Sequence, residues 1–205
     1  MDGQEYLNQI SAQARPKKAP RSGGFLGSPI FKVIIGGVAA LFLIIIMGSV
    51  LGGGAMGLKD KAISLKLYMG STMEVISGYQ NNVKSSNLRS SSASLYSVLS
   101  NTDRELTNYL TEKYAFTDKS VDSKMAEQEA LRKDGLTADL FEAKINGILD
   151  RIYAHKMAYE ISMIMSKESS VYDSTNDATL KDLLQTSYSS LENLYKNFDE
   201  FSETK

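Results

Sequence analysis

The stretch "LKDLLQTSYSSLENLYKNFDEF", residues 180–201, places apolar side chains at alternating intervals of four and three positions. This 4-3 spacing keeps one stripe of an α-helix facing a partner, as in coiled coils and helical bundles. The stretch therefore predicts a helix with one side packed against other helices. The stripe consists of Leu180, Leu184, Ser187, Leu191, Leu194, Phe198 and Phe201.

The same spacing occurs in three earlier segments, and no run of alternating β-branched residues competes with it. Four stripes joined by short links predict an all-α domain, an antiparallel four-helix bundle. The first stripe consists of Leu58, Ala62, Leu65, Met69, Thr72, Ile76, Tyr79 and Val83; the second of Leu88, Ser92, Leu95, Leu99, Thr102 and Leu106; and the third of Phe141, Ile145, Ile148, Ile152, His155 and Tyr159.

Turn-forming and capping residues suggest where these helices begin and end. Gly135 predicts the end of one extra short helix over residues 122–134, so that the third bundle helix would begin near Thr137. Asp177 is the predicted N-cap of the last helix. The sequence around Ser90 is rich in serine, whose hydroxyl competes for backbone partners, so the second helix is expected to begin after Ser90 or to fray there.

A different pattern precedes the bundle: residues 33–51, "VIIGGVAALFLIIIMGSVL", contain no charged side chain. A helix of about 20 apolar residues crosses the hydrocarbon core of a bilayer and satisfies its own backbone there. We therefore predict a single transmembrane helix over residues 30–52. The apolar residues that define this predicted span are Val33, Ile34, Leu41, Phe42, Leu43, Ile44, Ile45, Ile46 and Leu51.

Two other interpretations of the apolar segment stay open. A buried helix of a soluble protein rarely needs so long a run without a polar side. A cleaved signal peptide has a shorter apolar region behind a short basic start, although Gly53 and Ala55 would suit its cleavage site. The long polar leader before the segment favours an uncleaved anchor.

Basic residues predict the orientation of this anchor. Five precede the span, whereas Lys59, Lys61 and Lys66 are the nearest that follow it. Because basic residues concentrate on the cytoplasmic side, the N-terminus is expected to be cytoplasmic and the C-terminal domain extracytoplasmic. The five flanking basic residues are Arg15, Lys17, Lys18, Arg21 and Lys32.

These patterns divide the chain into four predicted parts. Residues 1–29 form a basic leader whose composition predicts disorder. The span of residues 30–52 comes next, and the glycines of residues 53–57 predict a flexible linker. Residues 58–205 form the helical bundle, which is long enough to fold around its own core.

Composition excludes several classes of function. Residues 1–32 carry a net charge of +3 and the remainder −4, so the bundle has no basic character that would attract nucleic acid. The chain contains no cysteine, which excludes disulfides, thiolate metal sites and cysteine nucleophiles. The HExxH, GxSxG and GxxxxGK motifs are also absent. We therefore expect a protein that is not an enzyme and that needs no cofactor.

The alternative with a cofactor depends on one histidine. His155, with Met157 and Met163 nearby, could ligate haem or copper, because imidazole and thioether groups suit soft metals. The competing interpretation is a structural histidine beside methionines that fill gaps in the core. A di-iron site is excluded, since it needs two Glu-x-x-His pairs.

The leading hypothesis is a single-pass membrane protein of the cell envelope whose bundle serves as a scaffold or protein-binding module. Its expected partners are the lipid bilayer and either another protein or a second copy, because a 4-3 stripe can pair between chains as well as within one. Ten of the eleven tyrosines lie in residues 58–205. Tyrosine suits both a wet interface and the edge of a core.

Overall fold

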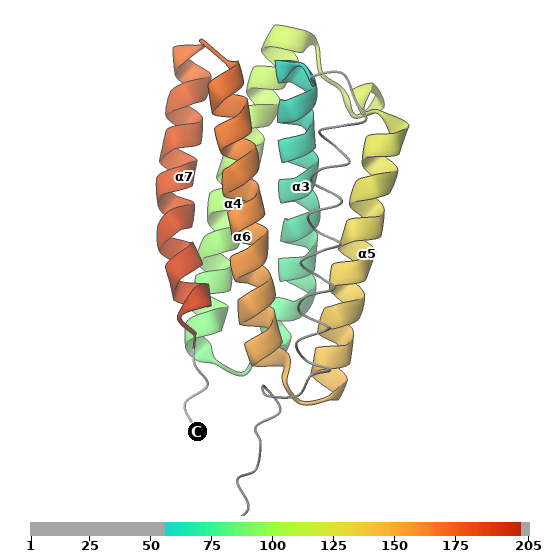
Figure 1. Cartoon of the computed structure of the whole chain (residues 1–205), viewed down its shortest axis with the longest axis vertical. Coiled ribbons are helices and arrows are strands. Elements are labelled where there is room, and N and C mark those ends of the chain that lie inside the picture. Colours follow the sequence, from blue (N-terminus) through green and yellow to red (C-terminus); the bar gives the residue numbers. More distant parts are fainter. Residues whose placement is uncertain (1–55, 202–205) are drawn as a thin grey trace, which may run out of the picture. The chain divides into compact units, whose positions relative to one another are not determined.

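The computed structural model describes residues 56–201, and this part of the chain contains helices and no strand (Figure 1). The predicted all-α class is therefore confirmed for these residues. The helices are α3 (Leu58–Tyr79), α4 (Ser86–Tyr114), α5 (Ser123–Ile145), α6 (Leu149–Ser174) and α7 (Ala178–Asp199), with the 3-10 turns η2 (Gln80–Asn82) and η3 (Asp118–Ser120).

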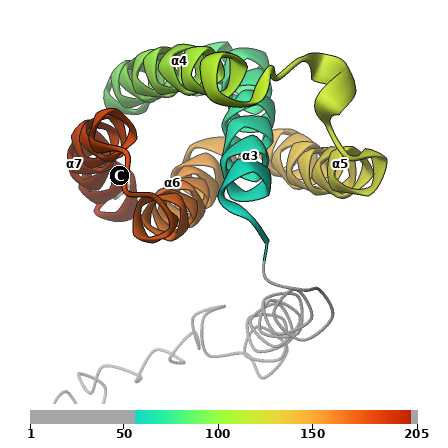
Figure 2. The ribbon, with the colours of Figure 1, turned by 90° about the horizontal axis from the view of Figure 1, so that it is seen from above.

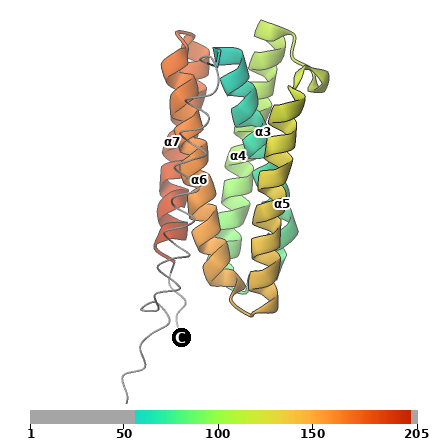
Figure 3. The ribbon, with the colours of Figure 1, turned by 45° about the vertical axis from the view of Figure 1, so that its right-hand side comes forward.

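Four of these helices form a ring around a shared core. Helix α3 packs against α4 and α6, and α7 also packs against α4 and α6 (Figure 2). Neighbours in the ring run in opposite directions (Figure 1). Helix α5 lies outside the ring, where it packs against α3 and α6 (Figure 3). The described residues therefore form a helical bundle with one helix added to its side.

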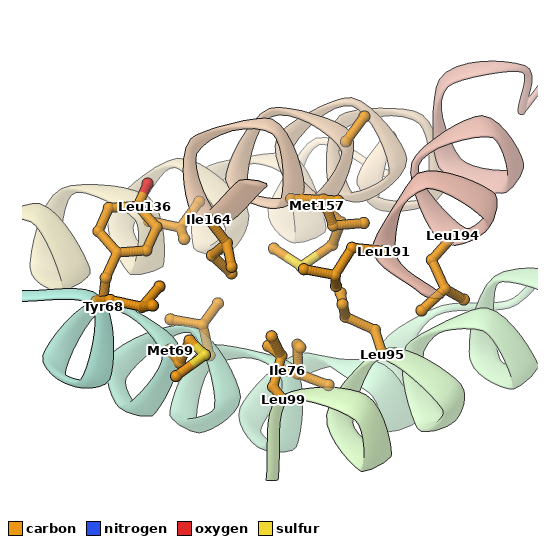
Figure 4. Packing of buried hydrophobic residues seen from close by; sticks show 14 of the residues in the cluster. Tyr68, Met69, Ile76, Leu95, Leu99, Leu136, Met157, Ile164, Leu191 and Leu194 are labelled. Carbon is orange, nitrogen blue, oxygen red and sulfur yellow. The ribbon is translucent and has the colours of Figure 1, made fainter. Parts of the chain in front are cut away.

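Three of the four predicted stripes supply the core (Figure 4). All six members of the second stripe are buried, and so is every member of the fourth except Phe201. In the first stripe, only Leu58 and Tyr79 are partly exposed. Burying an apolar side chain contributes about 1.5–3 kcal/mol, so these stripes are a main source of the stability of the bundle.

The prediction that the third stripe forms one buried face of a helix is wrong. Phe141 and Ile145 are 56% and 68% exposed, and His155 is exposed as well. The stripe runs across a break between α5 and α6, where Gly147 has a φ of 71°. A helix that stops at such a residue restarts with a new rotational register, so a spacing counted through the break does not mark one face. The buried side of α6 carries Leu149, Tyr153, Met157, Glu160, Ile161, Ile164, Glu168 and Val171.

The predicted extra helix is also longer than expected. It does not end at Gly135: it follows the N-cap Asp122 and runs over 23 residues, Ser123–Ile145. Thr137 is therefore no cap; its carbonyl oxygen accepts a hydrogen bond from the Tyr79 hydroxyl at 2.9 Å, which ties α5 to α3. Gly147, with its left-handed backbone, is the residue that stops the helix.

The ends of the other helices give one confirmation and one correction. Asp177 is the N-cap of α7, where its carboxylate accepts hydrogen bonds from the amides of Thr179 and Leu180. Helix α4 begins at Ser86, not after Ser90. The helix is capped by Ser85, whose hydroxyl accepts from the Leu88 amide, and buried Ser92 satisfies its own hydroxyl by donating to a carbonyl one turn earlier, at 2.6 Å.

Within residues 56–201, none of the helices combines the length and the apolar character that crossing a membrane requires. The predicted leader, the predicted span of residues 30–52 and most of the predicted linker lie outside the described residues. The membrane anchor therefore stays a prediction.

Candidate functional site

A partly buried polar cluster joins α5 to the bundle. Arg132 of α5 donates hydrogen bonds to Glu129 on the same helix, at 2.8 and 2.6 Å. Its guanidinium also forms an ion pair with Glu160 of α6 and donates a hydrogen bond to Ser71 of α3. The Ser71 hydroxyl donates in turn to Glu129. One arginine thus connects three helices, in what we call the Arg132 cluster: Arg132, Glu129, Glu160, Ser71 and Tyr68.

An aromatic ring completes this cluster. The Arg132 guanidinium carbon lies 3.8 Å from the centroid of the Tyr68 ring, in cation–π geometry. The ammonium of Lys167 lies 5.2 Å from the same centroid and donates to the Ser64 hydroxyl at 2.9 Å. Burial, reinforced by the nearby Glu160 carboxylate, raises the pKa of Tyr68, so its hydroxyl stays protonated. The ring binds the cations through its π face.

The cluster holds two carboxylates and one guanidinium, and the nearby ammonium of Lys167, which Glu129 attracts, supplies a second positive charge. Glu160 is 4% exposed, and burial raises its pKa, although the Arg132 guanidinium opposes that effect. Burial lowers the pKa of Arg132, but Tyr68 and the two glutamates more than offset it, and the net shift is upward. A buried ion pair of this kind costs desolvation energy and needs every partner in place. The cluster therefore fixes the position of α5 rather than offering a free reactive group.

A hollow of about 290 Å³ lies beside this cluster, between α3, α5 and the segment that connects α4 to α5. Ser71 and Glu129 line it together with apolar side chains such as that of Phe116. Two lysines at its rim already have acidic partners, in the ion pairs Lys66–Asp103 at 3.0 Å and Lys133–Glu74 at 2.7 Å. Because both lysines are already paired, they give the hollow no clear preference for an anionic or a cationic ligand.

The opposite side of α5 presents apolar side chains to solvent. Leu131, Phe141 and Ile145 are 66%, 56% and 68% exposed. Leu131, Ala138 and Ile145 are seven residues apart, about two helical turns, and so lie along one side. We call Leu131, Ala138, Phe141 and Ile145 the outer face of α5. The residues that α5 turns inward are Arg132, Leu136, Leu140 and Ala143.

The structure does not bring the predicted metal ligands together. His155 is exposed on α6, Met157 is completely buried and Met163 is partly buried. Residues two positions apart on a helix point about 200° apart, so His155 and Met157 face different sides of α6. Among the described residues, no group of three or more His, Cys, Asp or Glu side chains is arranged to hold a metal ion.

The sequence-based reasoning did not single out Arg132, Glu160 or Glu168. Glu160 and Glu168 are eight positions apart and both lie on the buried side of α6. The correct register of α6 would have revealed two acids among apolar residues. That register was hidden because the counted stripe began in α5.

Comparisons with known proteins found no match: no family model, no curated protein and no solved structure matches the chain. A functional assignment therefore depends on the geometry of this chain.

Proposed function

We propose that the protein is a single-pass membrane protein of the cell envelope whose extracytoplasmic bundle, an antiparallel four-helix bundle extended by α5, binds another protein or a second copy of the chain. One observation carries this proposal: α5 has apolar residues on two sides. Its inner side packs on α3 and α6, and its outer face exposes Leu131, Phe141 and Ile145.

The firm attachment of α5 supports its role as a docking surface. The Arg132 cluster holds the inner side of the helix through ion pairs and hydrogen bonds. A surface that is held rigidly loses little conformational entropy when a partner binds. Exposed large apolar side chains that gather on one side of a helix are typical of surfaces that bind a partner helix.

The membrane part of the proposal rests on the uncharged segment of residues 33–51 and on the basic residues before it. The absence of cysteine makes its test clean, because a single introduced thiol is the sole labelling site. Ser11→Cys reports on the leader, and Ser97→Cys reports on an exposed position of α4. A membrane-impermeant maleimide applied to intact cells should label Ser97→Cys, while Ser11→Cys should require lysis.

The reverse labelling pattern would contradict the orientation. Recovery of both variants in the soluble fraction would contradict the anchor itself.

A second experiment tests binding at α5. Ala138→Cys, labelled with a photoactivatable maleimide in membranes, should form a discrete crosslinked product, whereas labelled Ser97→Cys should not. A product of twice the mass of the chain identifies a second copy, and another mass identifies a different protein. Adding Ile145→Glu to the Ala138→Cys variant should reduce the product, because a charge opposes burial of the outer face. Equal products from both positions would refute the proposed surface.

A further inference from the structure

A second hollow lies between α6 and α7, and its lining differs from that of the hollow beside the Arg132 cluster. It has a volume of about 180 Å³. From α6 it is lined by Glu168, Tyr172 and Asp173, and from α7 by Leu184 and Tyr188. In α6, Glu168 and Tyr172 are one turn apart, as are Leu184 and Tyr188 in α7, so the two helices turn matching sides toward the same space.

Glu168 is the unusual member of this lining. Its side chain is 1% exposed, and neither carboxylate oxygen is hydrogen-bonded. The hydroxyl of Ser187, itself 2.9 Å from the Thr102 hydroxyl, is near enough to lower the pKa of Glu168, but burial dominates and raises that pKa to about 7. Ionising a buried carboxylate with so little compensation is unfavourable, unless a cation joins it.

The rest of the hollow favours an organic cation. Tyr172 and Tyr188 supply aromatic rings, whose faces attract ammonium groups. The protein already shows this contact, because the ammonium of Lys181 lies 4.7 Å from the centroid of the Tyr172 ring. Asp173 adds a second carboxylate at an exposed position. A hard metal ion would instead need several oxygen ligands, and the described residues provide no such group.

The volume limits the size of the ligand. Pockets for drug-sized molecules hold about 300–1,000 Å³, so a hollow of about 180 Å³ suits a smaller molecule. Its carboxylates would repel a ligand that carries an anionic group of its own, such as a zwitterion. Glu168 lines the hollow and so lies beside a cation bound there.

We propose that the hollow between α6 and α7 binds a small organic ammonium ion without an anionic group, with Glu168 as its counter-ion and the rings of Tyr172 and Tyr188 as its walls. The site uses none of the residues of α5 and does not depend on the membrane anchor. It can therefore be tested separately from the function proposed above.

The test is isothermal titration calorimetry of the full chain in a non-ionic detergent at pH 8 and constant ionic strength. Choline and glycine betaine are matched probes, since both carry a trimethylammonium group and betaine adds a carboxylate. Choline should bind saturably, and betaine should bind at least about tenfold more weakly. No saturable binding of choline, or equal binding of the two probes, would overturn the proposal.

Variants locate the site. Glu168→Gln keeps the shape of the side chain and removes its charge, so choline binding should weaken at least about tenfold. Glu192→Gln removes the same charge from an exposed position of α7, where Glu192 pairs with Lys196, and should leave binding unchanged. Unchanged binding in Glu168→Gln, with circular dichroism showing the same helix content, would overturn the assignment.

Lys181→Met gives a test in the opposite direction. It removes an ammonium that lies over the Tyr172 ring and whose charge opposes a second cation there, and it changes a side chain that is partly exposed and does not line the hollow. Choline should bind this variant several times more tightly. Weaker binding in Lys181→Met would overturn the proposal, because it would mean that the lysine helps to form the site.

Discussion

Helix α6 carries two buried glutamates in contrasting surroundings. Glu160 faces α5 and α3, where Arg132 forms an ion pair with it. Glu168, two turns later, borders the hollow toward α7 and has no basic partner among the described residues. Similar burial thus has two results: Glu160 belongs to a complete charge network that fixes a helix, whereas Glu168 holds a carboxylate whose charge is uncompensated. The first is suited to structure and the second to binding.

The largest loss of stability should come from removing Arg132, the cation that pairs with Glu160. Arg132→Leu leaves Glu129 and Glu160 with no guanidinium, and loss of one partner of a buried ion pair costs about 3–5 kcal/mol. Urea denaturation of the full chain in detergent, followed by circular dichroism, measures this loss. Arg104, an exposed arginine of α4, provides the control. Arg104→Leu should change the free energy of unfolding by less than about 0.5 kcal/mol. Equal effects of the two variants would mean that the Arg132 cluster does not hold α5.

Replacing Glu168 should change the free energy of unfolding by a smaller amount and should increase it. Its pKa is about 7 in the folded protein, whereas the ordinary pKa of a glutamate, which applies to the unfolded chain, is 4.5. Below pH 4.5 both states are protonated. As the pH rises toward 7 the unfolded chain ionises first, so the wild type loses stability, by at most about 3–4 kcal/mol. Glu168→Gln removes this loss.

The variant should therefore be more stable than the wild type at pH 8 and nearly equal to it at pH 4. Thermal melts at the two pH values check this difference. Glu192→Gln should show no such pH-dependent gain, and a Glu168→Gln variant that is destabilised at pH 8 would show that the ionised carboxylate stabilises the fold.

The Ser187 hydroxyl gives a finer test of the same contrast. It lowers the pKa of Glu168 against the dominant effect of burial. In Ser187→Ala the pKa of Glu168 should rise in the folded protein, so the pH range over which the protein loses stability should extend to higher pH, while its lower limit stays at the pKa of the unfolded chain. NMR titration of the glutamate side-chain carboxyl carbons measures the pKa directly. A fall in this pKa would show that Ser187 stabilises the protonated form instead.

The smallest effect is expected on the outer face of α5, the side away from the Arg132 cluster. Ile145 is 68% exposed, so Ile145→Ser should change the free energy of unfolding by less than about 0.5 kcal/mol. On the inner side, Leu140 is completely buried, and Leu140→Ala should cost about 2–5 kcal/mol. The two variants differ in burial within a single helix. A large loss in Ile145→Ser, measured by urea denaturation, would mean that the outer face is covered in the protein as it exists in detergent.

Three helices could be predicted because most of each apolar stripe lies within one helix; only Val83 and Phe201 fall beyond the ends of α3 and α7. In α4, for example, the spacing continues from Leu88 to Leu106, and each member is buried. The third stripe failed because Gly147 interrupts the chain between Ile145 and Ile148, which shifts the rotational register of everything that follows. A pattern of spacing alone does not show whether two residues belong to one helix.

The candidate sites could not be predicted from the sequence for a related reason. In the Arg132 cluster, Arg132 contacts Ser71 of α3, 61 positions earlier in the sequence, and Glu160 of α6, 28 positions later. The Glu168 hollow likewise needs α6 and α7 in their observed packing. His155 attracted attention because it is the sole histidine, yet its side chain is exposed.

The sequence by itself determined the helical class, the buried faces of α3, α4 and α7 and the N-cap at Asp177, because local spacing and capping chemistry depend on residues a few positions apart. It also determined the uncharged segment on which the predicted anchor rests. The tertiary structure alone decided which side of α5 faces solvent, which cation pairs with Glu160 and why Glu168 lacks one. Those properties depend on which helices become neighbours, and that choice is made by the packing of the whole core.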